Sequence, residues 1–154
     1  MIYIALIILV NLLFYIRTIG YGGICDDIPI FNRAIEIPKG YWWYFWYHLK
    51  GYKYKEWKLP HKMTLIVHAL NCVLIYLAFG RNNVSFIAAL LFSVNPMNNQ
   101  CAIWMSGRQY AINTALALIM WMFPFTSPLL YLLGTYFCGP NLIMFPLVFL
   151  FTKH

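Results

Sequence analysis

Two neighbouring carboxylates, Asp26 and Asp27, are the strongest candidates for chemistry in this sequence. They are two of only four acidic residues among 154, and they follow a Gly-Gly pair in the stretch YGGICDDIPIF. Adjacent aspartates in such a place cap a helix or close a turn, because Asp accepts hydrogen bonds from backbone N–H groups. Alternatively, a carboxylate held at a membrane surface serves as a general base, or, for Asp27, as a ligand of a divalent cation that bridges a phosphate. The pair by itself is compatible with both interpretations.

Arg108 is a candidate for binding a phosphate group. It is the only charged residue between Arg81 and Lys153, and the preceding Ser-Gly lets the backbone approach a ligand closely. Its planar guanidinium suits the phosphate of a specific lipid. The alternative is a side chain that snorkels to the headgroups of ordinary lipids. Lysines that follow the aromatic stretch YWWYFWYHLKG are candidates for the same lipid phosphate: Lys53, Lys55 and Lys58.

Two histidines and an asparagine add polar candidates inside an apolar segment. His68 lies seven residues after His61 and three before Asn71. Ionisable groups within a membrane usually face the interior of a helix bundle and are candidates for function. The structural alternative is a neutral His68 that is hydrogen-bonded to Asn71 or to a backbone carbonyl. The sequence contains no Ser-His-Asp order, no phosphate-binding glycine loop and no metal-ligand cluster.

The composition of the chain is that of a membrane protein. Hydrophobic residues make up 62%, charged residues 10%, and the mean hydropathy is +0.66, whereas soluble domains carry roughly a quarter charged residues. A globule of this size cannot bury so much apolar surface, so a bilayer is the expected solvent. The net charge is +7, and most basic residues lie between Arg17 and Lys62 among Trp and Tyr. Beside apolar segments this pattern indicates contact with anionic headgroups rather than with nucleic acid.

The apolar segments predict a single-domain, all-α integral membrane protein with about five to six transmembrane helices. Residues 1–17 form the first span, and we expect a retained anchor because no small-residue cleavage site follows them. Residues 18–60 are predicted to be an extramembrane loop with interfacial amphipathic helices. The other predicted segments are a second span at 61–80, a third at 84–95, an interfacial segment at 96–110 and the remaining spans at 111–152.

The cysteines are scattered and show no metal-binding spacing: Cys25, Cys72, Cys101 and Cys138. Cys72 lies in an apolar run, where a free thiol behaves as a small hydrophobic side chain. A Cys25–Cys101 disulfide requires both residues to face the same oxidising side. We therefore favour free thiols at these positions.

Three segments, in their order and spacing, resemble GT-C glycosyltransferases, in particular the transmembrane O-mannosyltransferase group with tetratricopeptide repeats and its bacterial relatives. DDIPI resembles the acidic pair in the first extramembrane loop of that group. HKMTLIVHALNCVLIYL resembles its next span, with His61, His68 and Asn71 in the matching places. LLFSVNPMNNQCAIWMSGRQY resembles its most recognisable block, and the matching residues are Pro96, Trp104, Ser106, Gly107 and Arg108.

The resemblance implies a membrane enzyme that transfers a sugar from a polyprenyl-phosphate donor to an acceptor hydroxyl. Asp26 or Asp27 would be the base, which must lie within hydrogen-bond reach of the acceptor. Arg108 and the loop lysines would hold the lipid phosphate, and a nearby cation would stabilise that leaving group. The implied partners are membrane lipids and the lipid-linked sugar.

The chain departs from the family pattern in two respects. Asn95 stands where the family has histidine, and Asn98 and Gln100 stand where it commonly has a histidine and a glutamate. Amides form hydrogen bonds but do not exchange protons near neutral pH. Family members are also several times longer. The chain is therefore either a minimal enzyme or an inactive GT-C-like scaffold, and a third alternative is a subunit that completes its site beside a partner protein in the membrane.

Two signals conflict over the side of the membrane on which residues 18–60 lie. The resemblance implies the non-cytoplasmic side. The positive-inside rule implies the cytoplasm, because the loop is short and rich in lysine. We expect the non-cytoplasmic side, because lipid phosphates on either face can hold these basic residues.

Overall fold

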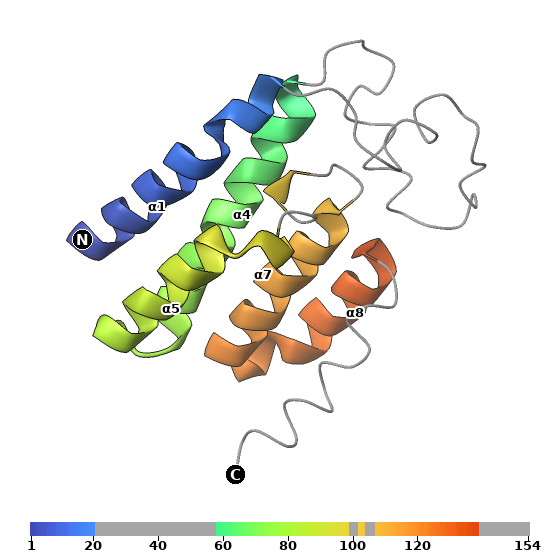
Figure 1. Cartoon of the computed structure of the whole chain (residues 1–154). Coiled ribbons are helices and arrows are strands. Elements are labelled where there is room, and N and C mark those ends of the chain that lie inside the picture. The colour runs from blue at the N-terminus through green and yellow to red at the C-terminus, as the bar shows by residue number, and fades with distance from the viewer. Residues whose placement is uncertain (21–57, 99–101, 104–106, 139–154) are drawn as a thin grey trace, which may run out of the picture.

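The computed structural model describes residues 1–20, 58–98, 102–103 and 107–138, and every regular element in this part of the chain is helical (Figure 1). No strand occurs among these residues. The α-helices and the short 3-10 helices (η) are, in chain order, α1 (Ile2–Tyr15), η1 (Ile16–Gly20), α4 (Lys58–Ala78), α5 (Asn83–Val94), η2 (Pro96–Asn98), α7 (Arg108–Met122), η3 (Pro124–Thr126) and α8 (Ser127–Cys138).

The predicted all-helical class is confirmed, but within the described residues only two helices have the length and composition to cross a membrane. They are Ile2–Gly20 and His61–Ala78. The predicted third span, α5, has 12 residues, and α7 has 15. At 1.5 Å per residue these helices are about 18 and 22 Å long, shorter than the roughly 30 Å of a hydrocarbon core. The described residues therefore do not confirm five to six full-length spans, and most of the predicted interfacial helices at 18–60 lie outside them.

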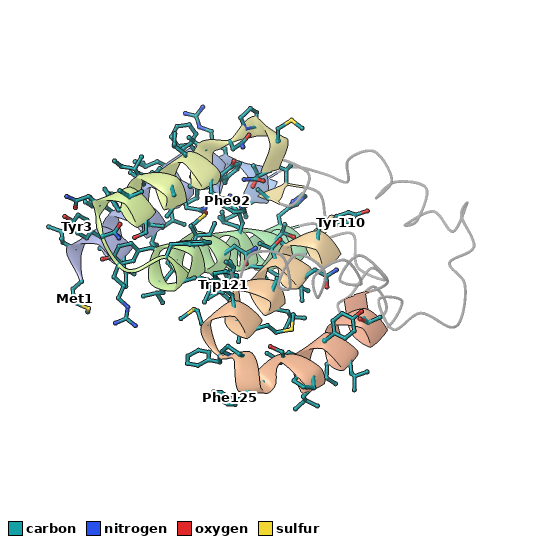
Figure 2. The ribbon with its side chains drawn as sticks, turned by 90° about the horizontal axis from the view of Figure 1, so that it is seen from below. Met1, Tyr3, Phe92, Tyr110, Trp121 and Phe125 are labelled. Atoms are coloured by element: carbon teal, nitrogen blue, oxygen red, sulfur yellow. The ribbon has the colours of Figure 1, made fainter. Side chains whose placement is uncertain are left out.

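Helix α4 is at the centre of the bundle. It packs on α1, α5 and α7, whereas α8 packs on α7. The Tyr3 ring contacts Tyr76 at 5.9 Å between centroids, and the Tyr15 ring contacts His68 at 5.2 Å. Because the contacts pair the start of α1 with the end of α4, these two helices run antiparallel. Figure 2 shows Met1 and Tyr3 at one end of the bundle and Tyr110 toward the other.

Two small side chains, Cys72 and Ala89, lie among the buried residues where α1, α4 and α5 meet. One cluster joins α1, α4 and α5 through the buried residues Ile7, Cys72, Tyr76 and Ala89. Small residues at helix contacts bring backbones together and increase van der Waals packing. Cys72 is a free, fully buried thiol that packs in this cluster, as predicted, and its sulfur also accepts a hydrogen bond from Asn11. No side chain is described for the other three cysteines, so the pairing of Cys25 with Cys101 lies outside the described residues.

Helices α5 and α7 extend along only part of α4 (Figure 1). Ser93, in the last turn of α5, contacts His68, and Ala111, in the first turn of α7, contacts Asn71. Because α4 begins at Lys58, it extends about 15 Å beyond His68. We call the end where η1 finishes and α4 begins the loop end. The opposite end, with Met1 and the turn between α4 and α5, is the turn end.

The turn between α4 and α5 is determined by its own sequence. Gly80 and Arg81 have φ values of 97° and 56°, and the Arg81 N–H donates to the Tyr76 carbonyl at 3.2 Å, as in a Schellman helix end. Asn82 then caps α5. Its side chain accepts from the Ser85 N–H, and its own N–H donates to the Ser85 hydroxyl, each at 2.9 Å. Local signals therefore produce the antiparallel α4–α5 hairpin.

Replacing Gly80 with valine is expected to lower the free energy of unfolding by about 1–2 kcal/mol, because a side chain is strained at positive φ. An added Cβ would also lie 3.2 Å from the Asn82 Nδ2. The matched control is Gly20→Val, where a Cβ meets no atom within 4 Å. Thermal unfolding of the purified chain in detergent micelles measures both, and equal melting temperatures for the two variants would contradict the strained turn.

Candidate functional site

The segments that carry the predicted site residues begin or end in the loop-end half of the bundle. Residues 21–57 follow Gly20 and precede Lys58, and both of these residues lie at the loop end (Figure 1). Helix α5 ends and α7 begins beside the middle of α4. Five predicted site residues lie outside the described part of the chain, namely Asp26, Asp27, Lys53, Lys55 and Gln100. Lys58 and Arg108 are the first residues of α4 and α7.

A row of buried polar side chains follows one face of α4 in this half. His61, Thr64, His68 and Asn71 recur at intervals of three and four residues, and each is at most 1% exposed. Such intervals place residues on one face of a helix. After Asn71 and Cys72, the next buried residue of α4 is Leu74, which is apolar. The buried polar row of α4 therefore extends from His61 to Asn71, and Thr64 is a member that the sequence analysis did not identify.

His68 is hydrogen-bonded to a backbone carbonyl, which is one of the two contacts expected for a histidine with a structural role. Its Nε2 lies 3.3 Å from the Ser93 carbonyl oxygen. Because a carbonyl oxygen only accepts, Nε2 is the donor. The ring also lies edge-on to Tyr15 and stacks on Phe92, with centroids 5.2 and 5.6 Å apart. The other alternative, a bond to Asn71, is not observed, since the Asn71 side chain donates to the Ala111 carbonyl at 2.8 Å.

The end of α5 is completed by side-chain hydrogen bonds because Pro96 follows it. The last four carbonyls of a helix have no intrahelical donor, and proline has no N–H to offer the Phe92 carbonyl. The Asn98 side chain donates to that carbonyl at 2.6 Å, and the Asn95 side chain accepts from the Met97 N–H at 2.9 Å. The two amides that the sequence analysis assigned as polar site residues therefore have structural hydrogen bonds at this helix end.

A second buried network joins α1 to α4 and α5. The Asn11 side chain donates to the Ser93 hydroxyl at 3.3 Å and to the Cys72 sulfur at 3.5 Å. Polar contacts of this kind between apolar helices help to determine which helices pair. The sequence analysis did not identify Asn11 or Ser93, although a single asparagine within an apolar helix is a recognisable signal.

The described residues contain no group of three or more His, Cys, Asp or Glu side chains that could hold a metal ion. Asp27, the predicted ligand of a divalent cation, lies outside these residues.

Lys58 and Arg108, two of the residues predicted to bind a lipid phosphate, begin helices at different positions along the axis of α4. The first is at the loop end, and the second is one turn before the Ala111–Asn71 contact.

Comparisons of the chain with protein-family models, with curated proteins and with solved structures found no match. The candidate site is therefore defined by its own geometry. It comprises the loop-end half of α4, the end of α5 and the start of α7.

Proposed function

We propose that the chain is a multi-pass integral membrane protein. The two long apolar helices support this placement. Large apolar side chains are also exposed along α1, as expected for contact with lipid, and they include Leu9 at 50%, Leu13 at 67% and Phe14 at 62%. Arg17 and Lys62 are exposed at the loop end, where their charges would meet the headgroups.

We propose that this membrane protein is a GT-C-like glycosyltransferase that uses a polyprenyl-phosphate sugar. One observation supports the proposal: the two resembling stretches that the structure describes in part meet at the middle of α4, where the end of α5 contacts His68 and the start of α7 contacts Asn71. DDIPI starts six residues after Gly20, the histidine stretch opens near the start of α4, and Ser-Gly-Arg leads into α7. A helix bundle could equally have separated the histidine stretch and Ser-Gly-Arg to opposite ends.

The proposed reaction is a single displacement at the sugar. Asp26 or Asp27 takes the proton of the acceptor hydroxyl as its oxygen forms a bond to the anomeric carbon. The bond between that carbon and the phosphate oxygen breaks, and polyprenyl phosphate leaves. Arg108 and the lysines of the loop would offset the negative charge that develops on the phosphate, and a divalent cation on Asp27 would serve the same purpose. The resemblance implies that this occurs on the non-cytoplasmic side.

An inactive scaffold or a subunit of a larger membrane complex is the second candidate. It is favoured by the hydrogen bonds of His68, Asn95 and Asn98, which all involve backbone groups at the end of α5. These three positions match or replace polar positions of the family, and here their observed contacts serve the fold. A protein that keeps the bundle without the reaction would show the same contacts.

The experiment that separates these candidates does not require a known acceptor. The purified full chain is reconstituted into liposomes with a panel of polyprenyl-phosphate sugars and a mixture of hydroxyl acceptors, and release of polyprenyl phosphate is measured. We expect release from at least one donor. If no donor is consumed by the folded, reconstituted chain, the glycosyltransferase proposal fails and the scaffold is favoured.

A further inference from the structure

Helices α7 and α8 each carry a buried polar side chain that makes no hydrogen bond. Asn113 is 6% exposed, and neither its Nδ2 nor its Oδ1 has a partner within the described part of the chain. The Oγ1 of Thr135 is also buried and unpaired among these residues. An amide offers two N–H donors and an acceptor oxygen, and a hydroxyl both donates and accepts. These two groups therefore have unused capacity to donate and to accept hydrogen bonds.

Asn113 lies on the face of α7 that is turned away from α4. It is about 160° around the helix from Ala111, whose carbonyl accepts the hydrogen bond from Asn71. Met120 follows Asn113 by seven residues, which places it on the same face, and it is fully buried. Apart from α4 and the adjoining η3, α8 is the described element that packs closely on α7. Asn113 therefore faces α8.

Asn113 and Thr135 lie at the same level of this helix pair. Helix α7 ends at Met122, α8 begins at Ser127, and the single turn of η3 joins them, so α7 and α8 run antiparallel side by side (Figure 1). Asn113 is nine residues before the end of α7, and Thr135 is eight residues after the start of α8. At 1.5 Å per residue they are about 14 and 12 Å from the turn. The two unpaired groups therefore belong to one position of the α7–α8 contact.

The surroundings of this position are apolar. Met120 is buried on the same face of α7, and Leu129 and Leu132 are exposed on the outer side of α8. A polar group that is buried in such an environment without a partner is strongly destabilising. Asn113 and Thr135 are not bonded to each other. A buried water molecule typically makes about three hydrogen bonds to groups of this kind, and one water can accept from an amide N–H while it donates to a hydroxyl oxygen.

We propose that Asn113 and Thr135 hold a buried water molecule between α7 and α8, and that this bridge determines the level at which α8 packs on α7. Apolar contacts are compatible with several levels. A slide of α8 by one turn, about 5.4 Å, would separate the two groups and leave both unpaired again. Polar contacts between apolar helices have the same role elsewhere in membrane proteins. The inference is independent of the proposed sugar transfer.

An experimental structure of the full chain, at a resolution that shows ordered water, tests the ligand directly. We expect a water molecule within about 3.2 Å of both the Asn113 amide and the Thr135 hydroxyl. Two side chains that bond directly to each other without water would overturn the proposal. Side chains that point to different surroundings would overturn it as well.

A double-mutant cycle tests the bridge in solution. The variants are Asn113→Leu and Thr135→Val, which keep the side-chain shapes, and the double variant. Chemical unfolding of the full chain in detergent micelles measures them. Each single substitution is expected to raise the equilibrium constant of unfolding by about tenfold. The double variant is expected to show about the same tenfold rise, because the second substitution removes a group whose water is already lost.

Ser127→Ala is the matched control for this cycle. The Ser127 hydroxyl oxygen is also buried and unpaired among the described residues, but it lies about 12 Å from Thr135 along α8, beyond the reach of one water. We expect its effect to multiply with that of Asn113→Leu. A rise of about 100-fold for the Asn113–Thr135 double variant would overturn the shared water. A lower unfolding constant for Asn113→Leu would show an amide without any partner and would overturn it too.

Discussion

Asparagine at both Asp26 and Asp27 is expected to slow sugar transfer by about 100-fold or more, because a positioned general base contributes roughly 10²–10⁴-fold. Asparagine keeps the shape of the side chain and its ability to accept a hydrogen bond, but it cannot take a proton near neutral pH. The substitution therefore removes the proposed chemistry and preserves a capping role. Transfer is measured as the rate at which the reconstituted variant releases polyprenyl phosphate.

The sequence supplies a matched control for this experiment. Glu36 is an acidic residue of the same segment, and Glu36→Gln removes a negative charge in the same way. We expect its rate to stay within about twofold of the parent, because Glu36 lies outside the acidic pair to which the resemblance assigns the base. The single variants Asp26→Asn and Asp27→Asn then identify the base. If the double variant keeps the parent rate, the pair has only the turn-capping role.

The largest expected loss of stability follows from His68→Ala. His68 is fully buried, its ring contacts Tyr15 and Phe92, and its Nε2 donates to the Ser93 carbonyl. Removing the ring leaves a cavity and a helix-end carbonyl without its donor. Together these effects are expected to lower the free energy of unfolding by about 3–4 kcal/mol. Chemical unfolding of the purified chain in detergent micelles measures the difference.

A second substitution separates the two causes of that loss. His68→Phe fills most of the same volume and keeps an aromatic ring between its neighbours, but it offers no donor to Ser93. We expect it to cost about 1–2 kcal/mol, which is the contribution of the hydrogen bond alone. If phenylalanine is as destabilising as alanine, packing contributes little at this position. If phenylalanine is neutral, the bond to the Ser93 carbonyl does not support the end of α5.

Local features of the fold were predictable because their causes are local. The spans predicted at 61–80 and 84–95 correspond to α4 at Lys58–Ala78 and α5 at Asn83–Val94. Gly80 ends the first of these helices, Asn82 caps the second, and Pro96 stops it. The hydrophobic composition likewise predicted helices whose exposed side chains are largely apolar. Each of these signals acts within a few residues of the place where the chain changes direction.

Hydrogen bonds between helices were not predictable in the same way. Asn11 and Ser93 are 82 residues apart, and His68 and Ser93 are 25 apart. Asn95 and Asn98 looked like neutral replacements in a reaction site, yet their side chains complete the helix that Pro96 interrupts. A family pattern indicates which polar positions recur. It does not indicate which backbone carbonyl each of them meets.

The sequence by itself determined that the chain is helical and apolar, and that the acidic pair, the two histidines of the apolar segment and Arg108 fall in three separate stretches. Only the tertiary structure decided that the second and third of these stretches meet at the middle of α4, where α5 ends and α7 begins. The physical reason is that helix length follows from local backbone and capping preferences. The level at which two helices meet depends instead on how buried side chains such as Asn11, His68 and Asn71 pair across the bundle.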